Sequence, residues 1–312
     1  MKLIESKAEY IPQTDLYKHI ELCGRTAYKS EDKITENSAE GFVARMIKSK
    51  HGAVLEHGTV YLIFPERMQN RSEYQLLISN PYTKAILHDR DCYITTNYRV
   101  IIENDITAFT SKPTEFHEKR YTIKFTTDRG VSHELVRHRK FSFVQESQRY
   151  CNYSKDKFGG EITFVKPSWF KEYQMPINVA VAQSPDINGA VFYERPYKTY
   201  WSKYTSDVSG FDWYKEDFFI HSCQTSEACY KLMLAEGCTP QEARAVLPNA
   251  TKTEILMTGF ASDWRFFFDL RYYGETGKPH PDMELLAGKA REEFIKAGIW
   301  EGIMSKPSKF DK

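Results

Sequence analysis

The order of strand-like and helical patterns is the feature that most constrains how this chain can fold. Short apolar or alternating runs at residues 59–64, 121–127 and 161–165 predict strands, whereas the chain from about Asp212 onward has mainly helical patterns. Strands and helices do not alternate regularly, as they would in a doubly wound parallel sheet. The pattern therefore favours an α+β fold with a mostly antiparallel sheet flanked by helices and a helical C-terminal half.

Helices are predicted from amphipathic spacing and from the residues that begin and end them. Thr239-Pro240-Gln241-Glu242 is typical of a helix start, with a threonine cap, a proline at the first position and a glutamate three residues after the cap. Gly52 is expected to stop the helix before it, and Asp128-Arg129-Gly130 is expected to form a turn. The other predicted helices span Asp15 to Tyr28, Ser38 to Lys50, Val131 to Arg139, Glu254 to Leu270 and Asp282 to Ala297.

Charge is balanced over the chain as a whole. The 312 residues include 43 Lys and Arg and 42 Asp and Glu, so the chain lacks the positive excess of a general nucleic-acid-coating protein. No apolar run approaches the roughly 20 residues that span a bilayer, and the first residues lack the apolar stretch of a signal peptide. We therefore expect a cytoplasmic protein without nucleic-acid or membrane partners.

Neither the cysteines nor the histidines have the spacing of a metal site, so no metal is expected. The six cysteines contain no Cys-x-x-Cys pair and are interpreted as small buried residues. His133-Glu134 followed by His138 invites comparison with zinc proteases, but that motif needs histidines four residues apart, and these are five apart. Gly-x-Gly-x-x-Gly and phosphate-loop patterns are also absent, which argues against a Rossmann-type nucleotide site.

One short segment concentrates positive charge. Residues 137–149 carry four basic side chains and one acidic one, a local charge of +3 in a chain whose total is +1. Consecutive helical residues point about 100° apart, so Arg137, His138 and Arg139 cannot all bind one group on a helix. Either they are divided between ligands or the helix ends there, and guanidinium groups suit phosphates. The same charges would also suit a solvated helix end.

Four segments together match the motif order of one enzyme family. Arg137-His138-Arg139 is followed, after seven residues, by Ser147, and the match continues through Tyr150. The other three segments are Leu55-Glu56-His57-Gly58-Thr59, Glu242-Ala243-Arg244-Ala245-Val246-Leu247-Pro248 and Phe267-Phe268-Asp269-Leu270-Arg271. In this set and order the segments resemble the flavin-dependent thymidylate synthases, and far more specifically than the arginine motif alone.

The resemblance implies an enzyme that methylates dUMP to dTMP. In this family methylenetetrahydrofolate donates the carbon and leaves as tetrahydrofolate, reduced FAD supplies the hydride, and NADPH reduces the flavin. Flavin and dUMP bind together between the interlocked subunits of a homotetramer. A cysteine-dependent thymidylate synthase matches less well, because none of the six cysteines has the Pro and His neighbours of its nucleophile.

The resemblance also implies where each ligand binds. Arg271 is expected beside the uracil ring as the catalytic residue, where a guanidinium stabilises negative charge developing on the base. The expected dUMP-binding residues are Glu134, Arg137, Gln145, Glu146, Ser147, Gln148, Arg149, Arg244 and Arg271. The expected FAD-binding residues are His57, Thr59, Arg137, His138, Arg139, Gln145 and Ser262.

Several of these residues also have a purely structural interpretation. His57 could be a core histidine, Arg244 a helix-surface arginine, and Arg271 an ion-pair partner of Asp269 or Asp263. Ser147 is interpreted as a binding residue, because a nucleophilic serine needs an adjacent base. At the level of the whole chain, the alternative is a nucleotide- or RNA-binding protein with a decayed flavin site. Its stacking groups would be Tyr150, Tyr153 and Phe158.

The chain departs from the family pattern in two places. Residues 66–115 are expected to be an insertion into a single synthase domain that spans residues 1–312, and within them residues 92–102 have strand character. At Phe260, Ser262 and Phe266 many family members carry Asn, Arg, and Asn or His that touch the flavin. Phenylalanine cannot supply those hydrogen bonds, so the flavin contacts of this chain should differ there.

Overall fold

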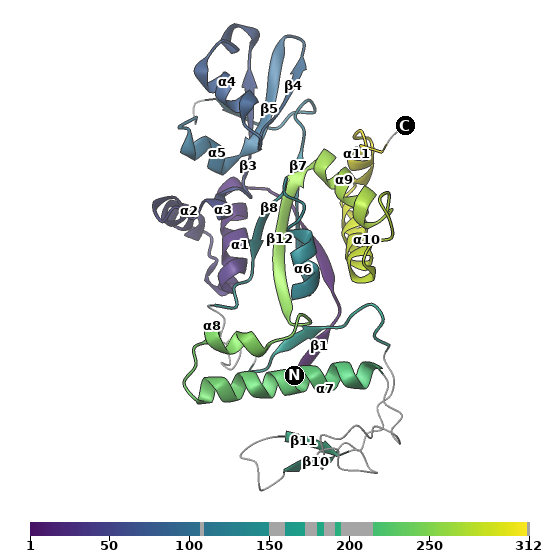
Figure 1. The fold of residues 1–312 in the computed structure, drawn as a ribbon. Helices are drawn as coiled ribbons and strands as arrows, with labels where there is room; N and C mark the ends of the chain where they lie inside the picture. The colour runs from purple at the N-terminus through teal and green to yellow at the C-terminus, as the bar shows by residue number, and fades with distance from the viewer. Residues whose placement is uncertain (107–108, 150–159, 172–179, 184–190, 195–214, 311–312) are drawn as a thin grey trace. The chain divides into compact units, whose positions relative to one another are not determined.

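The computed structural model describes residues 1–106, 109–149, 160–171, 180–183, 191–194 and 215–310 (Figure 1). The chain divides into two compact units. The smaller unit consists of Met1–Ile4 and Gln148–Thr251, and the larger of Glu5–Ser147 and Lys252–Lys312. Both units mix helices with strands, which confirms the α+β class.

The larger unit is built around a four-stranded antiparallel sheet. β7 and β12 pair along their whole length, from Lys252 opposite Asp128 to Phe260 opposite Arg120. Every residue of β12 after Lys252 is buried, as expected for a strand that has a neighbour on both edges and packing on both faces. The strands in order across the sheet are β2 (Lys7–Ile11), β7 (Arg120–Asp128), β12 (Lys252–Phe260) and β8 (Ser142–Gln145).

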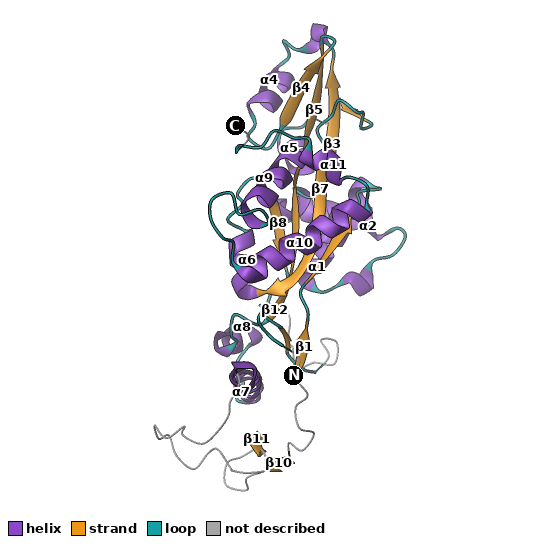
Figure 2. Cartoon of the chain, turned by 90° about the vertical axis from the view of Figure 1, so that its right-hand side faces the viewer, coloured by secondary structure: helices purple, strands orange, loops and turns teal. Residues whose placement is uncertain are grey.

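Helices cover both faces of this sheet (Figures 1 and 2). On one face, Phe125 and Met257 pack against Trp264, Phe268 and Phe294, all of which are completely buried. The helices of this face are α6 (Arg129–Leu135), α9 (Ala261–Arg271), α10 (Pro281–Lys296) and α11 (Trp300–Met304). The other face is covered by α1 (Leu16–Tyr28), with α2 (Ser38–Lys48), α3 (Gly52–Leu55) and the short 3₁₀ helix η1 (Glu31–Lys33) beside it.

Residues 66–115 contribute most of a second antiparallel sheet in the larger unit. Asp89 and Arg90 both have positive φ, 46° and 72°, and form the tight turn between its first two strands. The sheet has the order β4 (Lys84–His88), β5 (Asp91–Asn97), β3 (Thr59–Phe64) and β6 (Thr110–Ser111). The helices of this segment are η2 (Glu66–Met68), α4 (Ser72–Ser79) and α5 (Tyr98–Glu103).

The smaller unit has its own core, in which Phe164 packs with Cys223 and Tyr230. Its strands form two pairs: β1 (Lys2–Ile4) runs parallel to β9 (Thr163–Val165), and β10 (Ala180–Gln183) runs antiparallel to β11 (Val191–Glu194). Its helices are α7 (Lys215–Ala235), α8 (Pro240–Ala243) and the 3₁₀ helix η4 (Arg244–Val246). No helix in the described ranges is both long enough and apolar enough to cross a membrane.

Predictions that rest on local end signals are confirmed. β3 spans the predicted residues 59–64, and α1 follows Asp15, whose side chain accepts a hydrogen bond from the Lys18 amide at 2.8 Å. Thr239 and Glu242 form the expected capping box. The first residues of the helical region predicted from Asp212, residues 212–214, lie outside the described part of the chain.

Three predictions are wrong in part, and each of these errors has a local cause. Gly52 does not stop a helix but begins α3, because the turn after α2 is made at Lys50, whose φ is 57°. Asp128 caps α6 instead of opening a turn, and it accepts a hydrogen bond from the Val131 amide at 2.7 Å. The strand expected at 92–102 changes to helix at Asn97, whose side chain caps α5.

The largest error concerns the helix predicted for residues 254–270. The chain instead forms β12 up to Phe260 and only then α9. A continuously apolar run does not distinguish a buried strand from a buried helix. Here β7 and β8 provide hydrogen-bond partners for both edges of residues 252–260, and this pairing stabilises the strand over a helix.

Candidate functional site

The basic segment lies where α6 ends. The helix stops at Leu135, before Arg137, so the structure shows the second of the two alternatives: the helix ends before the consecutive basic residues. The amides of Arg137 and His138 donate to carbonyls only three residues back, at 3.3 and 3.0 Å, and Arg139 donates to Arg137 at 3.0 Å. As a result His138 turns inward and is 8% exposed, whereas Arg137 and Arg139 remain exposed.

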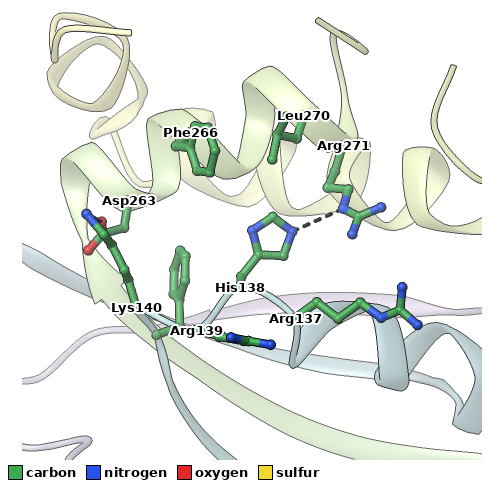
Figure 3. A pocket seen from close by; sticks show the side chains of 9 residues that line it. Arg137, His138, Arg139, Lys140, Asp263, Phe266, Leu270 and Arg271 are labelled. Atoms are coloured by element: carbon green, nitrogen blue, oxygen red, sulfur yellow. Dashed lines mark hydrogen bonds and ion pairs between the residues drawn. The ribbon is translucent and has the colours of Figure 1, made fainter. Parts of the chain in front are cut away.

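A small pocket lies between this segment and α9 (Figure 3). Asp263, Phe266, Leu270 and Arg271 are spaced three, four and one residues apart, which places them on one face of the helix. The pocket has a volume of about 180 Å³. Its lining combines cationic side chains with apolar and aromatic ones: Arg137, His138, Arg139, Lys140, Phe141, Asp263, Phe266, Leu270 and Arg271.

Arg271 is held by two partners that come from α6 and its C-terminal end. Its Nε donates to Nε2 of His138 at 3.0 Å, and its Nη1 donates to a carboxylate oxygen of Glu134 at 3.0 Å (Figure 3 shows the first of these). Its Nη2 has no hydrogen bond among the described residues. The alternative ion pairs with Asp269 and Asp263 do not form. Asp269 bonds Arg265 at 2.9 Å, and Asp263 lies 4.0 Å from the ammonium groups of two lysines.

The contact with Arg271 determines the protonation state of His138. Arginine can only donate, so Nε2 of His138 must accept, which makes the ring neutral with its proton on Nδ1. Burial, together with the nearby charge of Arg271, lowers the pKa of His138 to about 4. The ring therefore stays neutral at physiological pH, and Nδ1–H is available as a donor.

This depressed pKa predicts acid sensitivity. Above the unfolded-state pKa of about 6.5 His138 is neutral in both states and does not oppose folding. As the pH falls from about 6.5 toward 4, the unfolded chain binds a proton that the folded chain excludes, so the free energy of unfolding should fall by up to about 3 kcal/mol. Urea unfolding at pH 7, 6 and 5 would measure this fall in the free energy of unfolding.

In His138→Gln the free energy of unfolding should fall less steeply with pH. A fall as steep as that of the wild type would show that His138 is not its cause. The exposed His133→Gln is the control.

The residues at the end of β8 make contacts inside the larger unit. Gln145 donates from Nε2 to hydroxyls of Ser132 at 2.9 Å and Thr253 at 3.0 Å. Glu146 is 2% exposed, and its carboxylate accepts from Lys252 at 2.8 Å. The structure thus places the Glu146 carboxylate in a buried ion-pair network and not in the pocket lining.

The residues expected at the flavin lie at the ends of strands in the larger unit. His57 is completely buried, and its Nδ1 lies 2.7 Å from the hydroxyl of Thr258, so its side chain occupies a core position. Thr59 is 6% exposed and exchanges hydrogen bonds with Gln13 through its backbone. The hydroxyl of Ser262 donates to Glu118 at 2.6 Å.

Three expected dUMP contacts belong to the smaller unit. Gln148 is buried, and Arg149 donates from Nε to Gln241 at 2.9 Å. Arg244 begins η4 and is half-buried. Ser147, the last residue of the first segment of the larger unit, donates its amide to the carbonyl of Ala27 at 3.0 Å. In the described ranges no three His, Cys, Asp or Glu side chains are grouped as a metal site would require.

Sequence reasoning did not assign a site role to Asp263, Lys84 or Arg120. Asp263 could have been found, because it lies one turn before Phe266 on the same helix face. No residue near Lys84 in the sequence indicates a site role for it, because its position beside α9 depends on the β4–β5 hairpin. Arg120 is the first residue of β7. In the sequence, an arginine at this position cannot be distinguished from one that is exposed to solvent at the end of a strand.

Comparison with known proteins identifies the family to which this chain belongs. A family model described as thymidylate synthase complementing protein matches residues 90–297. The chain is 26% identical over 175 residues to a probable flavin-dependent thymidylate synthase of Paramecium bursaria Chlorella virus 1, covering 56% of this chain and 66% of the relative. It is 29% identical over 160 residues to a flavin-dependent thymidylate synthase of Corynebacterium efficiens, covering 51% and 50%. The chain thus spans about half to two thirds of the length of these relatives.

A solved structure is similar over most of the chain. It is a UMP/dUMP methylase, PolB, from Streptomyces cacaoi bound with 5-Br dUMP, and the alignment covers 98% of this chain and 97% of that one. The identity is 15% and the TM-score is 0.42, a value too low to support a conclusion.

Proposed function

We propose that this chain, which belongs to the family of thymidylate synthase complementing proteins, the flavin-dependent thymidylate synthases, methylates dUMP to dTMP. Methylenetetrahydrofolate would donate the carbon and leave as tetrahydrofolate, with FAD and NADPH as the redox partners. The family assignment rests on a model that matches well over half of the chain. The reaction is our inference from the site.

One observation carries the proposal: two protein partners orient the guanidinium of Arg271, which lines a pocket, and its Nη2 has no hydrogen bond among the described residues. Because Nε and Nη1 are bound by His138 and Glu134, rotation of the group is restricted. Nη2 is left to meet a ligand oxygen. A donor fixed in this way would stabilise negative charge as it develops on the uracil ring, and would make C5 more nucleophilic.

The pocket lining suits planar anionic ligands. Phe141, Phe266 and Leu270 offer apolar surface to a ring system, while Arg137 and Arg139 offer guanidinium groups to phosphates. These are the residues that would hold dUMP and the flavin. When bound, reduced FAD supplies the hydride. The neutral His138 ring could donate from Nδ1 to an acceptor on either ligand.

The remaining ligand contacts and the assembly are part of the same proposal. Gln145, Ser147, Gln148, Arg149 and Arg244 are proposed to bind dUMP. The active form is proposed to be an interlocked homotetramer, supported by the resemblance to the family. Residues 66–115 are proposed to be an insertion in a single synthase domain.

Tritium release from [5-³H]-dUMP tests the function. Purified protein would be incubated with added FAD, NADPH and methylenetetrahydrofolate, and each component would be omitted in turn. We expect release and dTMP formation only when all are present. Absence of release despite FAD binding would refute the synthase and indicate a repurposed flavoprotein. Absence of both release and FAD binding would favour the nucleotide- or RNA-binding alternative.

A further inference from the structure

Two cations flank one aromatic ring at the end of β12. The ammonium nitrogen of Lys84 lies 4.6 Å from the centre of the Phe260 ring, and the guanidinium carbon of Arg120 lies 5.5 Å from it. The three residues come from β4, β7 and β12, and all belong to the larger unit. Cations over aromatic faces are stabilised by the ring, so Phe260 offsets part of the cost of placing two positive charges beside it.

Arg120 lacks the partner that an enclosed charge needs. Its Nε has essentially no solvent-exposed surface and no hydrogen-bond acceptor among the described residues. Its other nitrogens reach only neutral groups: the hydroxyl of Thr59 at 3.4 Å, the carbonyl of Glu56 at 3.1 Å and the hydroxyl of Ser142 at 3.3 Å. In the described part of the chain no carboxylate lies within ion-pair distance of it. Burial accordingly lowers the pKa of Arg120 to about 10.

An enclosed cation without a contacting counter-ion is costly, and proteins normally pair such charges. Arg120 has only the more distant carboxylates of Glu56 and Asp263, which offset part of the effect of burial. The neutral groups around Arg120 satisfy part of its hydrogen-bonding capacity but none of its charge. An anionic ligand would satisfy both. The guanidinium fork and nearby hydroxyl groups are the donors that bind phosphate.

Lys84 supplies a second cation, and two neighbours fix its position. Its ammonium donates to the carboxylate of Glu118 at 3.1 Å and to the hydroxyl of Ser262. Asp263 lies 4.0 Å away. An ammonium group has three donors, so one remains after these two hydrogen bonds. The side chain is 27% exposed, which leaves it accessible to a ligand from solvent.

We propose that Lys84 and Arg120 form the subsite for the diphosphate of the dinucleotide cofactor, with the Thr59 hydroxyl beside them. This inference rests on the proposed function. It gives a role to residues 66–115, since their β4 strand carries Lys84 to the first turn of α9. At this position of α9 the chain has the uncharged Ser262, where many family members carry an arginine. Lys84, which is distant in sequence, supplies the positive charge instead.

Flavins with and without phosphates test the subsite in Lys84→Gln. FAD and riboflavin share the isoalloxazine ring, but riboflavin has no phosphate, so their dissociation constants separate ring binding from diphosphate binding. Loss of a charge-assisted hydrogen bond should raise the dissociation constant for FAD about tenfold and leave that for riboflavin unchanged. Lys84→Arg should retain most of the FAD affinity. The FAD defect should shrink as salt is added, because the lost interaction is ionic.

Lys119→Gln is the matched control, because Lys119 also lies over an aromatic ring, that of Tyr61, at 5.2 Å, but belongs to no part of the subsite. Thermal unfolding of each variant would show that it is folded. Arg120→Lys keeps the charge and loses the fork, and it should also weaken FAD selectively. Unchanged FAD affinity in Lys84→Gln, or equal losses for FAD and riboflavin, would overturn the subsite. FAD-selective loss without any dTMP formation by the wild type would keep the subsite and refute the synthase.

Discussion

Replacing Arg271 by alanine is expected to lower turnover about 100- to 1,000-fold while dUMP and FAD binding remain largely intact. The guanidinium is the group that His138 and Glu134 orient toward the pocket, and its Nη2 is the donor left for the base. Its effect should be greatest where charge develops, and therefore in the transition state. Steady-state kinetics would be compared with equilibrium binding of dUMP and FAD to the same preparation.

Two further variants make this result specific. Arg271→Lys keeps the positive charge but cannot bond both His138 and Glu134 in the same geometry, so it should recover only part of the activity. Arg99→Ala is the matched control, because Arg99 also makes two hydrogen bonds to carboxylates, those of Glu56 and Glu103, but lies away from the pocket. Full activity of Arg271→Ala would refute the catalytic role of Arg271. If dUMP affinity fell by the same factor as turnover, Arg271 would be a binding residue and not a catalytic one.

The largest effect on stability is expected from Lys252→Ala. Lys252 bonds Glu146 at 2.8 Å and Glu254 at 2.7 Å, and all three side chains are largely buried. Burial opposes the charge on Glu254, but Lys252, Lys29 and Lys124 hold its pKa well below the usual range. Removing Lys252 takes away the ammonium group that lies between these two carboxylates, although Lys29 stays 3.9 Å from Glu146. Breaking a buried ion pair by removing one partner should lower the free energy of unfolding by about 3–5 kcal/mol.

Urea unfolding at neutral pH would measure this change. Adding Glu146→Gln to Lys252→Ala removes a buried carboxylate that has lost one of its cations, and it should recover part of the lost stability. Lys296→Ala removes an exposed lysine paired with Glu293 and should leave stability nearly unchanged. A Lys252→Ala variant as stable as Lys296→Ala would show that the network contributes little. The depressed pKa of Glu254 also means that its contribution is complete above about pH 4.5 and is lost as the pH falls below that value.

The candidate site could be predicted only in part from the sequence. The signature around Arg137 and the later Arg271 were both identified, and the structure brings Arg271 to His138, which follows Arg137. Which acid would meet Arg271 was not predictable, because Asp263 and Asp269 are nearer in sequence than Glu134. On α9, Asp269 lies on the side that faces Arg265 and Ser308, and is therefore occupied.

The sequence by itself determined the features that depend on a few adjacent residues. Caps such as Asp15 and Thr239, the short strand at 59–64 and the basic segment after α6 are encoded in three- or four-residue hydrogen-bond patterns and in local charge. Such signals act within one turn or one strand, so they can be predicted without knowledge of the rest of the fold.

Only the tertiary structure decided the features that depend on distant partners. Residues 252–260 form a strand because β7 and β8 pair with both edges. Glu146 joins an ion-pair network because Lys29, which follows α1, and Lys252, in β12, both lie beside it. Lys84 reaches Ser262, 178 residues later, only because a hairpin carries it there. In each case register and packing bring together groups whose separation in sequence contains no information about their distance in space.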